Sequence, residues 1–133
     1  MLMNPYDAAH NLAKALRESS EFKEMQEAQA AVKADPSAKE MLLDFRKEQF
    51  NMHKQQLSGV EVSQDQKDKM EKLYEVVNMN TLLKSLLTAE YKVSVLLEDI
   101  QKIINEANKE IYDQELIGNI EDYFSEQGQE YEQ

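Results

Sequence analysis

The sequence has 133 residues but no cysteine and no tryptophan, and it contains only three glycines and two prolines. Without cysteine the chain can form no disulfide or thiolate nucleophile, and it offers no cysteine ligand to zinc or to an iron–sulfur cluster. An all-β sandwich or barrel needs many turns, and so few turn-forming residues do not supply them. These absences exclude cysteine chemistry and weigh against all-β folds.

Long hydrophobic runs are also missing. A membrane-spanning helix needs about 20 consecutive apolar residues, and no run of that length occurs. The N-terminus MLMNP has neither the basic start nor the apolar stretch of a signal peptide. With 41% hydrophobic and 31% charged residues, the chain is too charged for a membrane protein and too apolar for a fully disordered one, and its length predicts one domain. We therefore expect a cytoplasmic protein without a membrane span.

Acidic residues outnumber basic ones, 26 to 15, so the net charge is −11, and only Arg17 and Arg46 are arginines. Residues 113–133 hold seven acidic residues and no basic one, so this tail carries most of the net charge. Nucleic acids and anionic membranes bind surfaces on which lysine and arginine are clustered. We predict neither a nucleic-acid partner nor a membrane partner.

Signals for the start of a helix recur along the chain. They are Asn4-Pro5, Ser19 or Ser20, Asp35-Pro36, the capping box Ser63-Gln64-Asp65-Gln66, and Asn80. Gly59 after Ser58 is typical of a helix end. The sequence predicts an all-α bundle of about five helices in one domain over residues 1–112. The acidic tail over residues 113–133 is expected to be partly disordered.

The predicted fifth helix is the longest, and it carries an apolar stripe with heptad-like spacing to about Tyr112. At ~1.5 Å per residue this helix would be roughly 50 Å long, which a bundle of this size cannot cover. We therefore expect a homodimer or larger homo-oligomer, although one helix packed on its own hairpin with a frayed end is the alternative. The candidate interface residues are Leu83, Leu86, Leu87, Val93, Leu97, Ile100 and Ile104.

Groups for catalysis are few. The only histidines are His10 and His53, and no Gly-x-Ser-x-Gly motif occurs. Asp7 precedes His10 by one helical turn, as in half of a di-metal bundle site, but the second such pair is missing. We predict no catalytic, cofactor-binding or metal-binding residue and no cofactor.

Glu90 is the exceptional charge, because it falls inside the apolar stripe of the fifth helix. Burying a carboxylate costs several kcal/mol unless it is paired. Arg46, beside Phe45 on the third helix, is the first candidate partner, and Arg17 is the second. We favour a structural ion pair that fixes helix register or dimer alignment. The alternative is a small-molecule or metal-dependent enzyme with a bundle-core site around Glu90.

The acidic tail contains apolar residues, namely Ile117, Ile120, Tyr123 and Phe124. Two interpretations stay open. The tail either solvates the protein or docks, through one or two amphipathic turns, on the bundle or on a basic partner surface.

An ordered set of short motifs resembles the YlbF/YmcA-like family and, within it, the YheA branch. The motifs are Ala15-Leu16-Arg17 with Ser19 and Glu21-Phe22, Lys33-Ala34-Asp35-Pro36 with Ala38-Lys39, Phe45-Arg46 with Gln49, Ser58-Gly59, and Ala89-Glu90 with Val93-Ser94 and Ile103-Ile104. The resemblance covers roughly residues 4–112.

This resemblance implies a small helical protein that forms dimers or larger oligomers in the cytoplasm of Gram-positive bacteria and has no enzymatic activity. It also implies a regulatory adaptor that acts through protein contacts, since some family members influence competence, biofilm formation and sporulation and assist an endoribonuclease in messenger RNA processing. The iron–sulfur cluster that some members hold on C-terminal cysteines does not carry over, because this chain has no cysteine. The protein partner is not identified by the sequence.

Overall fold

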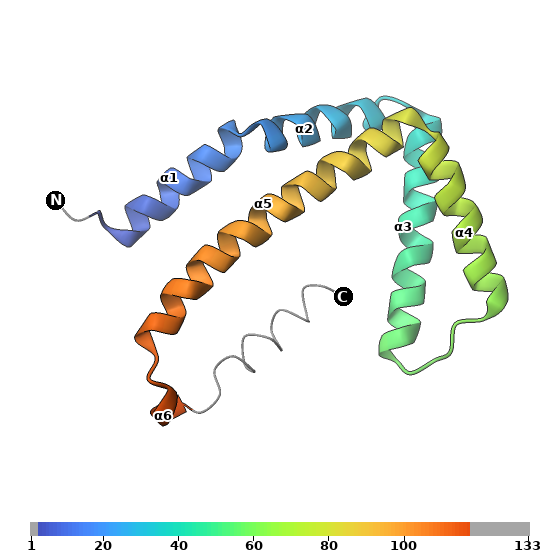
Figure 1. The fold of residues 1–133 in the computed structure, drawn as a ribbon. Coiled ribbons are helices and arrows are strands. Elements are labelled where there is room, and N and C mark those ends of the chain that lie inside the picture. The colour runs from blue at the N-terminus through green and yellow to red at the C-terminus, as the bar shows by residue number, and fades with distance from the viewer. Residues whose placement is uncertain (1–2, 118–133) are drawn as a thin grey trace. The chain divides into compact units, whose positions relative to one another are not determined.

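A computed structural model of the chain describes residues 3–117. Its helices are α1 (Pro5–Glu18), α2 (Ser20–Lys33), α3 (Pro36–Leu57), α4 (Gln64–Met79), α5 (Thr81–Ile111) and the short α6 (Gln114–Ile117) (Figure 1). The described residues contain no strand. The predicted all-α fold, with four helices followed by a long fifth one, is confirmed.

Contacts divide the chain into two units, residues 1–94 and 95–133, with the boundary inside α5. The proposed division into a bundle over residues 1–112 and a tail over residues 113–133 stays a prediction. Most of that tail, residues 118–133, lies outside the described part of the chain.

The helix starts follow from capping side chains. The Asn4 side chain accepts a hydrogen bond from the Tyr6 amide at 2.8 Å, directly before Pro5. Between the two candidate serines, Ser19 is the cap of α2, because its hydroxyl accepts from the Phe22 amide at 3.2 Å. The same hydroxyl donates to the Leu16 carbonyl at 2.6 Å, so one residue ends α1 and begins α2.

The later helices use the same devices. Asp35 accepts from the Ala38 amide at 3.1 Å and begins α3. Ser63 and Gln66 form the predicted capping box of α4, with bonds of 3.2 and 3.0 Å. Gly59, with φ of 73°, adopts the left-handed conformation that suits glycine after the end of α3.

The core of the first unit lies where α2, α3, α4 and α5 meet. Its buried side chains are Val32, Ala38, Phe45, Val77, Leu83 and Leu86. The α3–α4 hairpin is antiparallel (Figure 1), and a Lys69–Glu48 ion pair of 3.4 Å joins its two helices. The rings of Phe45 and Tyr74 pack across the same hairpin with centroids 6.3 Å apart. Apolar burial at these helix junctions is the main stabilising contribution.

The second unit is built differently, because none of its residues with a described side chain is buried. Its part of α5 carries exposed apolar side chains, including Leu97 (43% exposed), Ile103 (67%) and Ile104 (43%). Helices in proteins gain most of their stability from the packing of an apolar face, and this part of α5 buries no residue.

Among the described residues, no helix has an apolar stretch long enough to cross a membrane.

Candidate functional site

The structure brings two of the singled-out charged residues together. The Arg46 guanidinium of α3 donates a hydrogen bond from Nη2 to Oε1 of Glu90 on α5, forming an ion pair. The two side chains are 43% and 28% exposed, so the pair is partly solvated rather than buried. Pairing and partial exposure together reduce the cost of placing Glu90 inside an apolar stripe.

Arg17, the second candidate partner of Glu90, lies in the last turn of α1 and is exposed. Within the described part of the chain it forms no ion pair. The positive charge of Arg17 interacts favourably with the negative C-terminal end of the α1 helix dipole. This interaction accounts for a basic residue at that position without any contact to Glu90.

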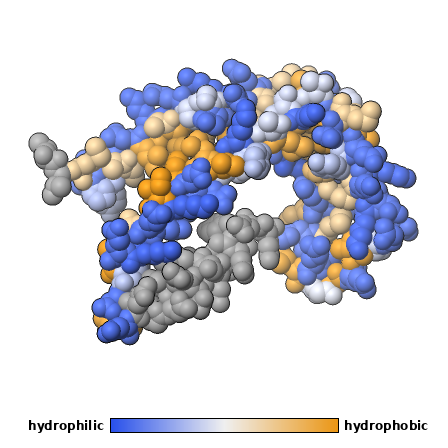
Figure 2. Space-filling view, viewed as in Figure 1, coloured by the Kyte–Doolittle hydropathy of each residue, from blue (hydrophilic) through white to orange (hydrophobic). Residues whose placement is uncertain are grey.

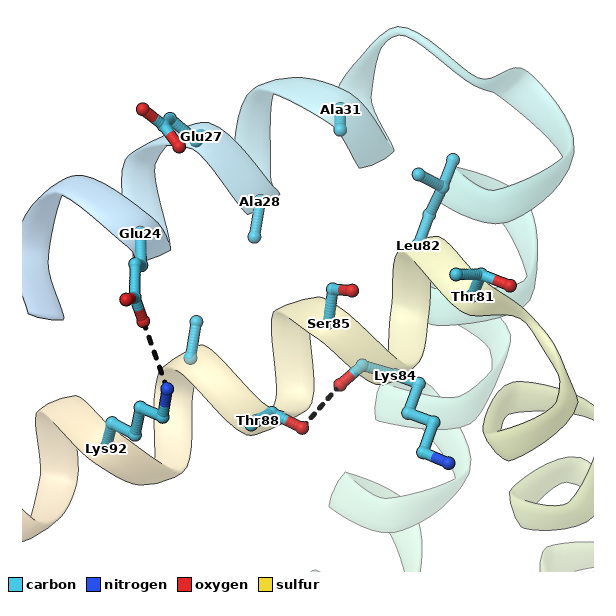
Figure 3. A pocket seen from close by; sticks show the side chains of 11 residues that line it. Glu24, Glu27, Ala28, Ala31, Thr81, Leu82, Lys84, Ser85, Thr88 and Lys92 are labelled. Atoms are coloured by element: carbon cyan, nitrogen blue, oxygen red, sulfur yellow. Dashed lines mark hydrogen bonds and ion pairs between the residues drawn. The ribbon is translucent and has the colours of Figure 1, made fainter.

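A second ion pair joins α2 to α5. Lys92 Nζ lies 3.2 Å from Oε2 of Glu24, and both side chains are about half exposed, at 52% and 51%. Exposed pairs of this kind contribute little to stability, typically well under about 1 kcal/mol. Figure 3 shows this pair closing one end of an open groove between the two helices.

The groove has a volume of about 630 Å³ and is lined by α2 and the first half of α5. Small side chains, including Ala28, Ala31 and Ser85, form much of its wall (Figure 3). Its volume would suit a small molecule, but such sites also need convergent polar groups held in place. In this groove the Glu24 carboxylate is bonded to Lys92, and the Thr88 hydroxyl donates to the Lys84 carbonyl at 2.9 Å. These two polar groups therefore already have partners within the protein.

The groove and the Glu90 ion pair are separate features of the structure. Glu90 is paired with Arg46 and is not among the residues that line the groove. Of the residues that the structure describes, no histidine, arginine or aromatic one lines it either. Among the described residues, no cluster of three or more histidine and acidic side chains is placed to hold a metal ion. The alternative of a bundle-core enzyme around Glu90 stays a prediction, and the bond of Glu90 to Arg46 does not favour it.

The predicted interface residues of α5 fall into three groups. Leu83 and Leu86 are buried in the core of the first unit, and Val93 is 9% exposed, so these three side chains are already covered within one chain. Leu87 and Ile100 are half-buried. Leu97 and Ile104, each 43% exposed, remain available for contact with another chain. The helical period could not separate these groups, because it does not show which turns of α5 the other helices cover.

The structure also shows exposed apolar side chains that sequence analysis missed. Leu43, Phe50 and Leu57 on α3 are 56%, 66% and 69% exposed, although Phe45 on the same helix is 4% exposed. The sequence does contain a signal for this second apolar face of α3, because Leu43, Phe50 and Leu57 are spaced regularly by seven residues. This set of positions is distinct from the set that faces the core.

Fold and surface together define a small all-α protein whose described residues present exposed apolar faces. The chain belongs to the family described as control of competence regulator ComK, YlbF/YmcA, whose family model matches residues 6–107. The suspected resemblance is thereby confirmed.

Similar chains come from several bacteria. UPF0342 protein STH1710 of Symbiobacterium thermophilum is 42% identical over 102 residues, which cover 77% of this chain and 91% of that protein. UPF0342 protein ABC1519 of Shouchella clausii is 37% identical over 111 residues, covering 84% and 94%. The relatives therefore match this chain over nearly their whole length.

Two solved structures share the fold. The structure of YheA from Bacillus subtilis has a TM-score of 0.62 and 30% identity, and the match covers 83% of this chain and all of YheA. A DUF964 protein from Bacillus stearothermophilus has a TM-score of 0.72 at 24% identity, covering 80% of this chain and 93% of that one.

Proposed function

We propose that this protein is a non-catalytic regulatory adaptor of the bacterial cytoplasm that acts through protein–protein contacts as a homodimer or larger homo-oligomer. The observation that carries the proposal is the amount of apolar side chain left exposed along α5 and α3 beside a small core. Exposed apolar faces of this extent are typical of interaction surfaces. The family description, control of competence regulator ComK, supports a regulatory role.

The second half of α5 is the proposed contact between copies. Leu97, Ile100 and Ile104 recur at intervals of three and four residues and therefore lie on one side of the helix. Burying such a side chain contributes about 1.5–3 kcal/mol. Two copies packed through this face would cover it and would support the part of α5 that has no buried residue of its own.

The oligomer part of the proposal is tested by light scattering coupled to size-exclusion chromatography. Leu97→Glu and Ile104→Glu place a charge on the proposed contact face, and each should shift the protein from dimer toward monomer. Val95→Glu is the matched control, because Val95 is 36% exposed but lies about 200° around the helix from Leu97. A wild-type monomer, or equal dissociation by all three variants, would refute the α5 contact.

The adaptor part is tested by capture from native bacterial cytosol, followed by quantitative mass spectrometry. Full-length wild type should enrich the same protein partner reproducibly, and Val95→Glu should retain it. If Leu97→Glu loses the partner, the partner binds either to the dimer or directly to the α5 face. An absence of any protein enriched above the bait's own subunits would contradict the adaptor function.

A further inference from the structure

One face of α3 is turned away from the core and carries a line of apolar side chains. Leu43, Phe50 and Leu57 recur every seven residues, so they lie close to one line along the helix. At ~1.5 Å per residue this line is about 21 Å long, or roughly four helical turns. Figure 2 shows hydrophobic residues among hydrophilic ones on the surface of the α3–α4 hairpin. The line is therefore long enough for a second helix to pack along it.

Two lysines flank the apolar line on the same side of α3. Lys47 follows Leu43 by four residues and Lys54 follows Phe50 by four, so each lies next to an apolar side chain. Both lysines are exposed, and neither takes part in the ion pairs of the described residues. We call Leu43, Lys47, Phe50, Lys54 and Leu57 the α3 outer face.

The acidic residues of this stretch of α3 lie on another side of the helix. Asp44 and Glu48 are placed about 100° and 140° around the helix from Leu43, whereas Lys47 and Lys54 lie within about 40° of it. Glu48 pairs at 3.4 Å with Lys69 of α4, the neighbouring helix of the hairpin. The α3 outer face therefore carries only positive charge, although the whole chain has a net charge of −11.

The pattern of this face selects among possible occupants. In packed helix pairs, apolar residues at one heptad position contact the partner helix, and charged residues four positions later flank the contact and set partner choice. The α3 outer face has this spacing. A helix that lies on a membrane needs a broad apolar stripe, and a single line of three side chains does not supply one. A second copy of α3 would bring no acidic residue to the lysines, because Asp44 and Glu48 lie elsewhere on the helix.

We propose that the α3 outer face binds an amphipathic helix of a partner protein that is apolar along one line and acidic beside it. The apolar residues of that helix pack on Leu43, Phe50 and Leu57, and its glutamate or aspartate side chains pair with Lys47 and Lys54. Apolar contact supplies affinity, and the charges select the partner and its register. The proposal rests on the adaptor function, since it states the chemistry of the partner that the adaptor takes.

The test uses a synthetic probe and the full-length protein. The probe is a fluorescein-labelled peptide of about three heptads, with leucine at the apolar positions and glutamate at the flanking ones. A twin peptide carries lysine in place of each glutamate. In fluorescence anisotropy, the wild type should bind the acidic peptide and not the basic one. Lys47→Glu with Lys54→Glu should weaken the acidic peptide about tenfold or more, because two attractive contacts become repulsive, and should restore binding of the basic peptide.

Matched variants separate this face from general effects of charge and apolar area. Lys67→Glu with Lys72→Glu makes the same change in net charge at two exposed positions of α4 and should leave binding unchanged. Phe50→Ala should weaken the acidic peptide, whereas Tyr91→Ala should not, although Tyr91 is 70% exposed and Phe50 is 66% exposed. Circular dichroism of each variant verifies that helix content is retained.

Several results would overturn the proposal. The wild type could bind neither peptide, or the α4 variant could lose the acidic peptide as fully as the α3 variant does. Vesicles containing phosphatidylserine that bind the wild type but not the Lys47→Glu, Lys54→Glu protein, with no peptide bound, would assign the face to a membrane. Dissociation of a dimer by Phe50→Ala, again with no peptide bound, would assign it to a second copy.

The adaptor function can stand when this surface fails. A partner captured from cytosol equally well by the wild type and by the Lys47→Glu, Lys54→Glu protein would keep the adaptor function and refute the α3 outer face as its binding site. A partner that is captured by the wild type and lost in this variant, but retained by Lys67→Glu with Lys72→Glu, would agree with a binding site on α3.

Discussion

At the scale of single residues, the Arg46–Glu90 pair connects α3 to α5 across 44 positions of sequence. Its contribution to the free energy of unfolding is limited, because the side chains are partly exposed, solvent screens their attraction, and both lose rotamer freedom. The pair is therefore better suited to fixing the register between two helices than to supplying much stability. The groove residues Glu24 and Lys92 form a more exposed pair, for which the same argument gives a smaller effect.

A double-mutant cycle with Glu90→Gln and Arg46→Met should give a coupling energy of about 0.5–1 kcal/mol in the free energy of unfolding, measured by urea denaturation. The matched cycle with Glu24→Gln and Lys92→Met should give a smaller coupling, since both of its side chains are about half exposed. Strictly additive losses for Glu90 and Arg46 would mean that the two residues do not interact in solution.

At the scale of elements, α5 begins at a well-defined cap. The Asn80 side chain accepts hydrogen bonds from the amides of Leu82 and Leu83 at 3.0 and 3.2 Å. Because Leu83 is fully buried, this cap fixes the first turn of α5 at the center of the core. The first half of the helix is held by the core of the first unit, whereas its second half has no buried residue.

Asn80→Ala should therefore destabilise the protein by about 1 kcal/mol, because two amides at the start of α5 lose their acceptor. Asn78→Ala is the control, since Asn78 lies exposed inside α4 and alanine is the better helix former there. We expect that substitution to be neutral or to stabilise by a few tenths of a kcal/mol. Thermal unfolding followed by circular dichroism compares the two, and an equal loss for both would contradict the role of the cap.

At the scale of the whole molecule, the proposed dimer predicts that folding and association are coupled. A homodimer is stabilised by mass action, so its unfolding midpoint depends on protein concentration. Raising the concentration tenfold should raise the midpoint by about 2–3 °C, as expected for a dimer of two domains of this size. Leu97→Glu should abolish this dependence. A wild-type midpoint that is independent of concentration would argue against an obligate dimer.

The sequence by itself determined the helices, because their signals are local. Asn4-Pro5, Asp35-Pro36 and the Ser63–Gln66 capping box act over three or four residues, and the structure uses each of them as expected. The choice of Ser19 over Ser20 could not be made in advance, since both hydroxyls are placed to cap and only the direction of the chain after Glu18 decides between them.

Only the tertiary structure decided how the apolar residues are divided between core and surface. Leu83 and Leu97 have the same side chain and the same heptad-like pattern, yet one is buried by α2, α3 and α4 and the other is 43% exposed. Likewise, Phe45 enters the core while Phe50, on the same helix, faces outward. Helical periodicity places a residue on a side of its helix, but burial depends on which segments, distant in sequence, pack against that side.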